Sequence, residues 1–177
     1  MGNILVLGAG AMGTAFSFPC SDNGHSVSIV GTHLEDEFID NISSTRKHAG
    51  LNCEVPKTVK FYKFGQLGEQ INKKIDFIAI AVISKGIEWA SLQLSKVMNK
   101  NVPILILTKG LAINENNYEV LAHKVERLLK KNGIKETNIT AAGGPCLAKG
   151  LANKAHTSVV FANNDINVVK QISRLVS

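Results

Sequence analysis

The sequence predicts an α/β fold, built on a doubly wound and mainly parallel sheet of the Rossmann type. Runs at residues 4–7, 75–82 and 102–107, apolar apart from Asp76, are typical of strands that are buried on both faces. Segments with helical spacing of apolar residues alternate with these runs, as in such a sheet. A glycine pattern, G-x-G-x-x-G, stands directly after the first run, at residues 8–13.

Each glycine of this pattern has a mechanical role in a dinucleotide-binding turn. Gly8 permits a tight turn, Gly10 lets a pyrophosphate approach the main chain, and Gly13 lets the following helix pack against the strand. The free N–H groups at the start of that helix, with its dipole, would hold the phosphates. Glycine also marks ordinary turns. Here the pattern lies between a strong strand and a helical segment, which favours a dinucleotide fingerprint.

The remaining elements are predicted from the same periodicities. We expect a loop at residues 44–56, strands at 27–30, 58–62, 139–142 and 157–162, and helices at 14–23, 34–43, 65–74, 86–98, about 118–131 and after 163–165. Pro19 has no N–H to donate to the carbonyl of Ala15, so the first helix is expected to kink or to change pitch there.

The residues after the second strand bear on the choice of cofactor. Gly31, Thr32 and His33 stand where the chain would meet an adenosine ribose. An acidic residue at that place would bind the ribose hydroxyls and repel a 2′-phosphate. Glu35 and Asp36 are expected further on, in the first turn of the next helix. The neutral residues leave room for a 2′-phosphate, so NADPH is slightly favoured over NADH.

Other candidate site residues follow the later strands, because open α/β sheets bind ligands at the carboxyl ends of their strands. Ser84 follows the strand at 75–82, and it is also a suitable N-cap for the next helix. Lys109 follows the strand at 102–107. It either contacts a phosphate or substrate oxygen as a point charge or is a solvated loop lysine. Residues 143–145, Gly-Gly-Pro, form either a tight turn or a place where backbone approaches a ligand.

Composition limits the class of protein. A chain of 177 residues suits one domain, and its net charge of +6 is scattered without a long basic run. That charge indicates a solvated surface or a cationic cleft for phosphorylated ligands, and we expect no nucleic-acid partner. No segment is apolar enough to cross a membrane, and no targeting peptide precedes the first strand. Cys20, Cys53 and Cys146 form no C-x-x-C pair, which predicts reduced thiols, no metal site and a cytoplasmic location.

Four motifs together resemble the N-terminal half of NAD(P)-dependent sn-glycerol-3-phosphate dehydrogenases. The resemblance covers nearly the whole chain, and its last two motifs are much more specific than the glycine fingerprint. The motifs are Gly8-Ala9-Gly10-Ala11-Met12-Gly13-Thr14-Ala15, Asn23-Gly24-His25-Ser26-Val27, Lys109-Gly110-Leu111 and Gly143-Gly144-Pro145-Cys146-Leu147-Ala148. Pro19 and the Gly-Thr pair at 31–32 resemble archaeal-type members more than bacterial ones.

The resemblance implies reversible hydride transfer between dihydroxyacetone phosphate and NAD(P)H, giving sn-glycerol 3-phosphate. It implies that Lys109 lies close to both cofactor and substrate, and that Gly144 and Cys146 contact the phosphate-ester end of the substrate. Cys146 stands where bacterial members commonly have serine. The resemblance further implies that the dinucleotide is bordered by Ala11, Met12, Thr32, His33 and Ala148.

The family also has a C-terminal helical domain, which carries the acid/base lysine and the residues that grip the substrate phosphate. That domain is absent from this chain, so we expect residues 1–177 to be one dinucleotide-binding domain that turns over substrate poorly or not at all alone. The resemblance allows a homodimer in the full-length enzyme. Two alternatives are a stand-alone NAD(P)-binding or redox-sensing module and another two-domain dehydrogenase of the β-hydroxyacid or ketopantoate type. The Lys109-Gly110 and Gly144-Pro145 motifs argue against the second.

Overall fold

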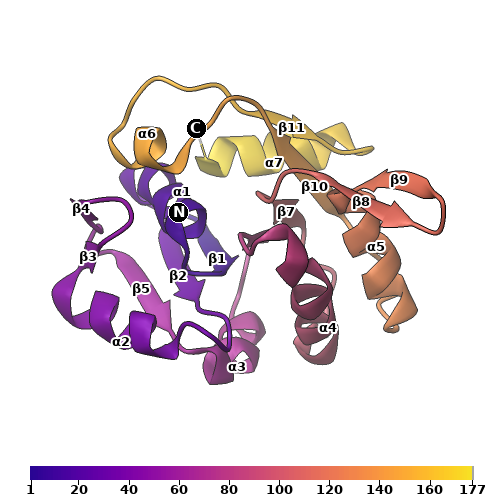
Figure 1. Ribbon diagram of the computed structural model, residues 1–177, viewed down its shortest axis with the longest axis horizontal. Coiled ribbons are helices and arrows are strands. Elements are labelled where there is room, and N and C mark those ends of the chain that lie inside the picture. Colours follow the sequence, from indigo (N-terminus) through magenta and orange to yellow (C-terminus); the bar gives the residue numbers. More distant parts are fainter. Residues whose placement is uncertain (177) are drawn as a thin grey trace.

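The computed structural model describes residues 1–176 and confirms the predicted doubly wound sheet (Figure 1). Seven strands follow the order β11-β10-β7-β6-β1-β2-β5, and all neighbours pair in parallel except β10 and β11. The strands are β1 (Asn3–Leu7), β2 (Ser26–Val30), β5 (Val59–Tyr62), β6 (Phe77–Ile80), β7 (Ile104–Ile106), β10 (Ile139–Gly143) and β11 (Val160–Ala162).

Helices cover both faces of this sheet. They are α1 (Ala11–Asp22), α2 (Asp36–Thr45), α3 (Leu67–Asn72), α4 (Ile87–Val97), α5 (Leu121–Lys131), α6 (Ala148–Ala152) and α7 (Ile166–Val176). Short 3₁₀ turns, Phe64–Gln66 and Ser84–Gly86, lead into α3 and α4. Among the helices of residues 1–176, none has the length and apolar character that a membrane span requires.

The core consists of two hydrophobic layers that share the sheet. In β1, Ile4 and Val6 pack into the layer that holds α1, α2, α6 and α7, while Leu5 and Leu7 pack into the layer that holds α3, α4 and α5. Successive side chains of a strand point to opposite faces, so a strand covered on both sides needs apolar residues at every position. The uninterrupted apolar runs therefore locate the central strands.

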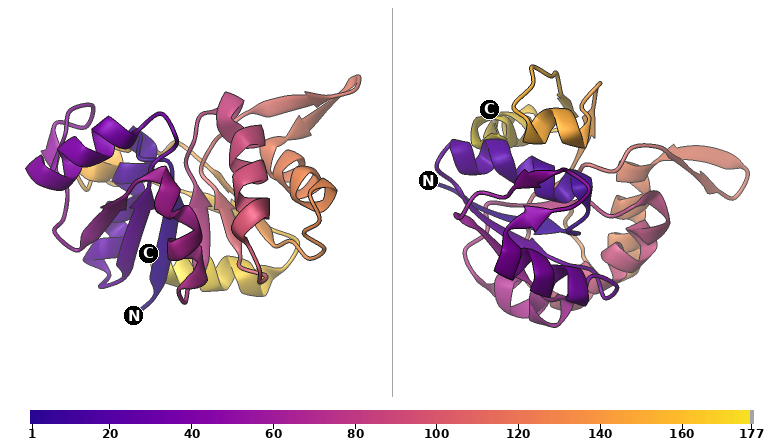
Figure 2. Two further views of the ribbon diagram at one scale, coloured as in Figure 1. Left: turned by 90° about the horizontal axis from the view of Figure 1, so that it is seen from below. Right: turned by 60° about the vertical axis from the view of Figure 1, so that its left-hand side comes forward.

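Two antiparallel hairpins lie where the sequence predicts other structure. The segment expected as a loop contains β3 (Lys47–His48) paired with β4 (Cys53–Glu54). A second hairpin joins β8 (Leu111–Asn114) to β9 (Asn117–Val120), so the helix expected from residue 118 begins only at Leu121. This hairpin projects from the body of the molecule in both views of Figure 2. Strands this short leave little periodic signal, and Tyr118 continues the helical spacing of α5 by coincidence.

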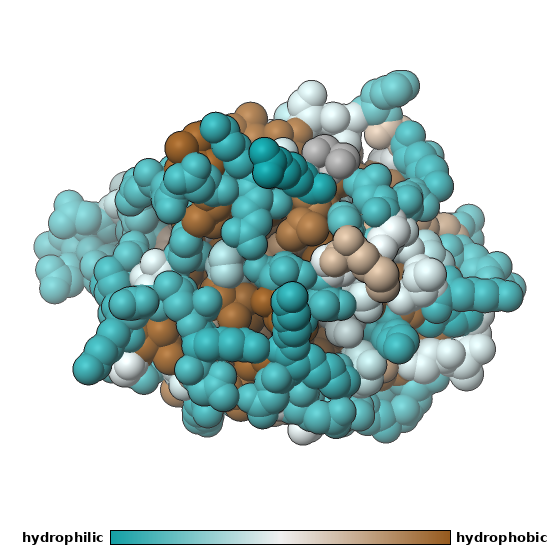
Figure 3. Space-filling model, turned by 180° about the vertical axis from the view of Figure 1, so that it is seen from behind, coloured by the Kyte–Doolittle hydropathy of each residue, from teal (hydrophilic) through white to brown (hydrophobic). Residues whose placement is uncertain are grey.

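Smaller differences concern helix boundaries. The helix α1 begins three residues earlier than expected, at Ala11, and continues through Pro19 to Asp22 as predicted. Ser84 begins the 3₁₀ turn before α4 and makes no cap hydrogen bond, so the prediction that it is an N-cap is wrong. The short helix α6 was not predicted. From behind, hydrophilic side chains cover most of the surface and hydrophobic patches show between them (Figure 3), as expected for the scattered charge.

Candidate cofactor-binding site

The glycine loop after β1 is tight at two positions and open at a third. Gly8 has a φ of +108°, and a Cβ built there would lie 3.0 Å from the carbonyl carbon and oxygen of Ala81, which directly follows the neighbouring strand β6. A Cβ on Gly13 would lie 2.1 Å from the carbonyl oxygen of Gly8. A Cβ on Gly10 would meet nothing within 4 Å. The loop therefore has open space at the glycine where a pyrophosphate is expected to approach the main chain, and it fits that group.

The first turn of α1 begins directly at this open glycine. Gly10 is the N-cap, and no side chain of the described residues caps the helix. The first N–H groups of an α-helix have no partner within the helix, so those of Ala11 and Met12 are available to an anion. The loop is also fixed by a hydrogen bond to the helix that follows it, because the Thr14 hydroxyl donates to the carbonyl of Ala9 at 2.9 Å.

A carboxylate does lie at the end of β2, which corrects the sequence-based expectation for Glu35. Glu35 precedes α2, and its side chain turns back toward the glycine loop. The Glu35 Oε2 atom accepts hydrogen bonds from the backbone N–H of Thr32 at 2.6 Å and of Ala9 at 3.2 Å. Asp36 occupies the first turn of α2, as expected. The interpretation that no acidic side chain lies at the end of β2 is therefore wrong.

His33 lies at the same edge of the sheet and belongs to a group of aromatic rings. Its ring centroid is 4.8 Å from that of Trp89 and 6.4 Å from that of Phe64. Ser84 is exposed in the 3₁₀ turn before α4. Sequence reasoning missed Phe64 and Trp89, because each lies in a helical turn and neither carries a motif.

His48, on β3, is a second polar side chain that the sequence analysis did not single out. It is only 5% exposed, and its Nδ1 accepts the N–H of Leu51 at 3.2 Å. Its Nε2 is buried without a hydrogen-bond partner among the described residues. Burial lowers the pKa of His48, and interactions with the Ala9 backbone and Glu35 oppose that shift only in part.

Lys109 connects the ends of two strands on the other side of β1. It follows β7, and its Nζ donates to the carbonyl of Gly144, in the turn after β10, and to that of Cys146 at 3.4 Å. Gly144 has a φ of +107°, and a Cβ there would lie 2.6 Å from the carbonyl oxygen of Ser158. Both the conformation and the lack of space require glycine. The structure thus brings together Lys109, Gly144 and Cys146, which the sequence analysis placed at one site.

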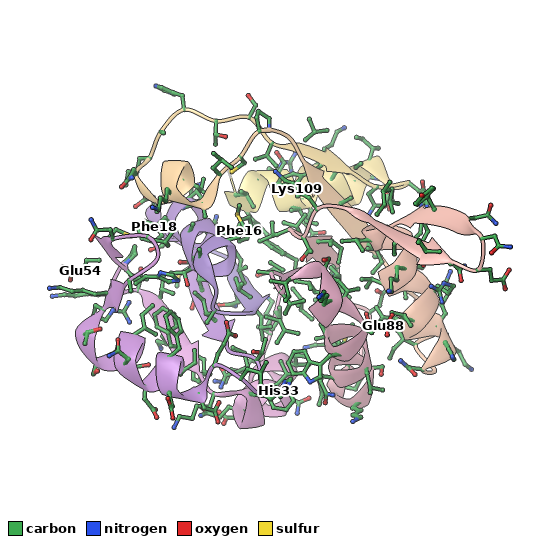
Figure 4. All side chains as sticks on the ribbon, viewed as in Figure 1. Phe16, Phe18, His33, Glu54, Glu88 and Lys109 are labelled. Carbon is green, nitrogen blue, oxygen red and sulfur yellow. The ribbon has the colours of Figure 1, made fainter. Side chains whose placement is uncertain are left out.

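Cys146 and Ala148 lead from this turn to α6. The side chain of Cys146 is buried and lines an apolar cavity of about 50 Å³, together with Met12 and Lys109. Ala148 begins α6, which packs against α1. In Figure 4, Lys109 and His33 lie well apart, toward opposite sides of the molecule. The candidate site therefore extends along the sheet edge from the aromatic rings to Lys109. In residues 1–176, no group of three or more His, Cys, Asp or Glu side chains is arranged to hold a metal ion.

A sequence profile of the NAD-dependent glycerol-3-phosphate dehydrogenase N-terminus matches residues 3–169. The chain belongs to this family. It corresponds to the N-terminal, NAD-binding half of these dehydrogenases, which are oxidoreductases that depend on NAD or NADP. The resemblance inferred from the four motifs is thereby confirmed.

Individual members of the glycerol-3-phosphate dehydrogenase family are similar over nearly the whole chain. The NADP(+)-dependent enzyme of Archaeoglobus fulgidus is 29% identical over 174 residues, which is 96% of this chain and 50% of that protein. The NAD(P)+ enzyme of Francisella tularensis is 32% identical and is also covered to 50%. The chain thus spans about half the length of the curated relatives it matches.

Solved structures show the same fold. The glycerol-3-phosphate dehydrogenase of Coxiella burnetii superimposes with a TM-score of 0.83 at 21% identity, over 99% of this chain and 51% of that one. The Plasmodium falciparum enzyme gives a TM-score of 0.83 at 17% identity, over 99% of this chain and 50% of that one.

Proposed function

We propose that this chain is the cofactor-binding domain of an enzyme that transfers hydride reversibly between dihydroxyacetone phosphate and NAD(P)H, giving sn-glycerol 3-phosphate. The observation that carries the proposal is the contact of Lys109 with the Gly144 turn, on the same sheet edge as an open glycine loop. Residues 1–177 form one dinucleotide-binding domain in this proposal. Groups supplied by the other half of the relatives complete the active site, so the chain alone has little or no turnover.

The residues of the site have different roles in binding the cofactor. Gly8 and Gly13 shape the loop, and the N–H groups from Gly10 to Met12 hold the pyrophosphate. The cofactor, when bound, supplies the hydride. Further cofactor contacts come from Thr32, His33, Ser84 and Ala148.

Lys109 stands at the reacting end. Its ammonium group stabilises negative charge that develops on the substrate oxygen, and it contacts cofactor and substrate alike. It is not the acid/base group in this proposal. Gly144 and Cys146 contact the phosphate-ester end of the substrate, with Lys109 holding their carbonyls in place.

For the cofactor we propose NADPH or NADH, with NADPH slightly favoured. The neutral Thr32 and His33 support this preference, as does the NADP(+) dependence of the Archaeoglobus fulgidus relative. The Glu35 carboxylate works in the opposite direction because it would repel a 2′-phosphate. We further propose a cytoplasmic enzyme that forms a homodimer at full length and binds neither nucleic acid nor membranes. The three free cysteines support the cytoplasmic location.

A fluorescence titration of the purified chain with NADPH and with NADH tests the proposal. We expect saturable binding of both, a response of the bound cofactor to dihydroxyacetone phosphate, and no net oxidation. The variant Lys109→Met should weaken that response about tenfold or more, whereas Lys149→Met, an exposed lysine on α6, should not.

Three other results of the titration would contradict or change the proposed function. Absence of binding to either cofactor would contradict the proposed function. Binding without a response to dihydroxyacetone phosphate would favour a stand-alone NAD(P)-binding or redox-sensing module. Rapid oxidation would show that the chain needs no further groups for catalysis.

A further inference from the structure

Three aromatic side chains from separate segments meet at the carboxyl edge of the sheet. His33 follows β2, Phe64 begins the turn after β5, and Trp89 lies in the first turn of α4, after β6. The Trp89 ring centroid is 5.1 Å from that of Phe64 and 4.8 Å from that of His33, with interplanar angles of 48° and 40°. Phe64 and Trp89 are half-buried and His33 is exposed, so the group has an accessible side.

The order of the strands places His33 and Phe64 on the opposite side of β1 from the reacting end of the site. Trp89 follows β6, next to β1, and its ring lies against that of His33. The strands β2 and β5 lie on one side of β1, while β6, β7 and β10 lie on the other. Lys109 and Gly144 follow β7 and β10, and the open Gly10 follows β1 between the two ends. A dinucleotide with its pyrophosphate at Gly10 and its reacting ring near Lys109 therefore extends its adenosine half toward His33.

We propose that Trp89 is the stacking surface for the adenine base, with Phe64 supporting the indole and His33 bordering it. This inference rests on the proposed function. The indole is the largest flat ring in the group, and it contacts both other rings. Stacking uses the π-face of a base and not its hydrogen-bonding edge. The Trp89 ring therefore favours a flat purine and does not distinguish purines by their exocyclic amine.

The chain offers a direct optical test because Trp89 is its single tryptophan. Titration of the wild-type chain with AMP should quench tryptophan emission saturably. IMP, which lacks the exocyclic amine, should bind within about threefold of AMP, because stacking tolerates different bases. Nicotinamide mononucleotide, which lacks a purine, should leave the emission unchanged at the same concentrations.

Variants then measure what the ring contributes. By calorimetry, Trp89→Leu should bind AMP about tenfold more weakly, whereas Trp89→Phe should stay within about threefold of wild type. Leu92→Ala provides a matched control, since it removes a 41%-exposed apolar side chain one turn further along α4 and should leave the affinity unchanged. Thermal melts of all variants check that each is folded.

The outcomes separate this inference from the proposed function. Failure of the wild-type chain to bind NADPH or NADH, followed through the fluorescence of the reduced cofactor, would refute the proposed function itself. Binding of the cofactor together with an unchanged AMP affinity in folded Trp89→Leu would overturn only the role of Trp89. Quenching by nicotinamide mononucleotide as strong as that by AMP would also overturn the inference, because the nicotinamide half of the dinucleotide would then bind at this ring.

Discussion

At the scale of single residues, the three glycines of the loop after β1 are under different constraints. Gly8 and Gly13 leave no room for a Cβ, and the obstructing atoms are backbone or a packed side chain. Such atoms cannot move without shifting a strand. Gly10 is open, so its lack of a side chain serves the ligand and not the fold. Stability and binding can therefore be separated by substitution.

The variant Gly10→Ala should unfold at about the wild-type urea concentration but bind NADPH at least about tenfold more weakly, because the methyl group occupies the space for the pyrophosphate. Gly13→Ala should lose about 2 kcal/mol or more of the free energy of unfolding through its clash with the Gly8 carbonyl. Urea denaturation and cofactor titration measure the two effects. Equal loss of stability in both variants would refute the distinction.

Glu35 combines two tasks, because it fixes the loop at Ala9 and places negative charge beside Thr32, where we propose that the adenosine ribose binds. In Glu35→Gln the amide oxygen can still accept these hydrogen bonds, but the charge is gone. The ratio of NADPH to NADH affinity should therefore rise about tenfold. Asp36→Asn, one residue further in α2, is the matched control and should leave the ratio near its wild-type value. An unchanged ratio in Glu35→Gln would show that the carboxylate does not face the 2′ position.

At the scale of elements, the segment between α2 and β5 depends on a few polar contacts. Arg46 ends α2 with a φ of +58°, and its guanidinium donates to the carbonyls of Val55, Pro56 and Val59 while lying 5.3 Å from the Phe61 ring. The adjacent His48 packs against Phe38, with ring centroids 5.1 Å apart. The β3–β4 hairpin is thus held against α2 and β5 by the side chains of Arg46 and His48.

His48 should make stability depend on pH. Its folded-state pKa lies below the ordinary value because of burial, so the unfolded chain binds more protons in acid. The stabilisation is fully present above the unfolded pKa of about 6.5 and is lost as the pH falls through it toward the folded value. Urea midpoints of His48→Gln should fall less between pH 7.5 and 5.5 than those of wild type.

His156→Gln, which changes an exposed histidine, serves as the control for this pH series and should behave as wild type does. The same slope in wild type and His48→Gln would mean that carboxylates alone set the pH dependence.

Elements whose side chains are buried in a regular pattern can be predicted from the sequence. Elements that depend on a few specific contacts cannot. The central strands are recognisable because both faces are buried, and α5 because Leu121, Val125 and Leu129 recur on one side. The β3–β4 and β8–β9 hairpins are too short to show a period. The contact of Glu35 with the glycine loop and the contact between Phe64 and Trp89 join residues that are far apart in the sequence. No local sequence pattern predicts such contacts.

At the scale of the whole molecule, the sheet order accounts for the extent of the site. The strand β1 carries the phosphate loop at the centre. His33 and Phe64 follow β2 and β5 on one side of it, with Trp89 reaching them from α4, and Lys109 follows β7 on the other side. The chain spans about half of its curated relatives, and it contains the part of the site that lies along this edge. The central claim is that one dinucleotide lies across the edge from Trp89 to Lys109.

The most direct test is the change in backbone amide chemical shifts of the ¹⁵N-labelled chain when NADPH is added. The account predicts saturable shifts with one dissociation constant at Gly10, Ala11 and Met12, at His33, and at Gly110 beside Lys109. The amide shifts of the β3–β4 hairpin and of the C-terminal end of α5 should stay unchanged. Shifts confined to one end of the edge, or centred on the hairpins, would contradict a dinucleotide lying along it.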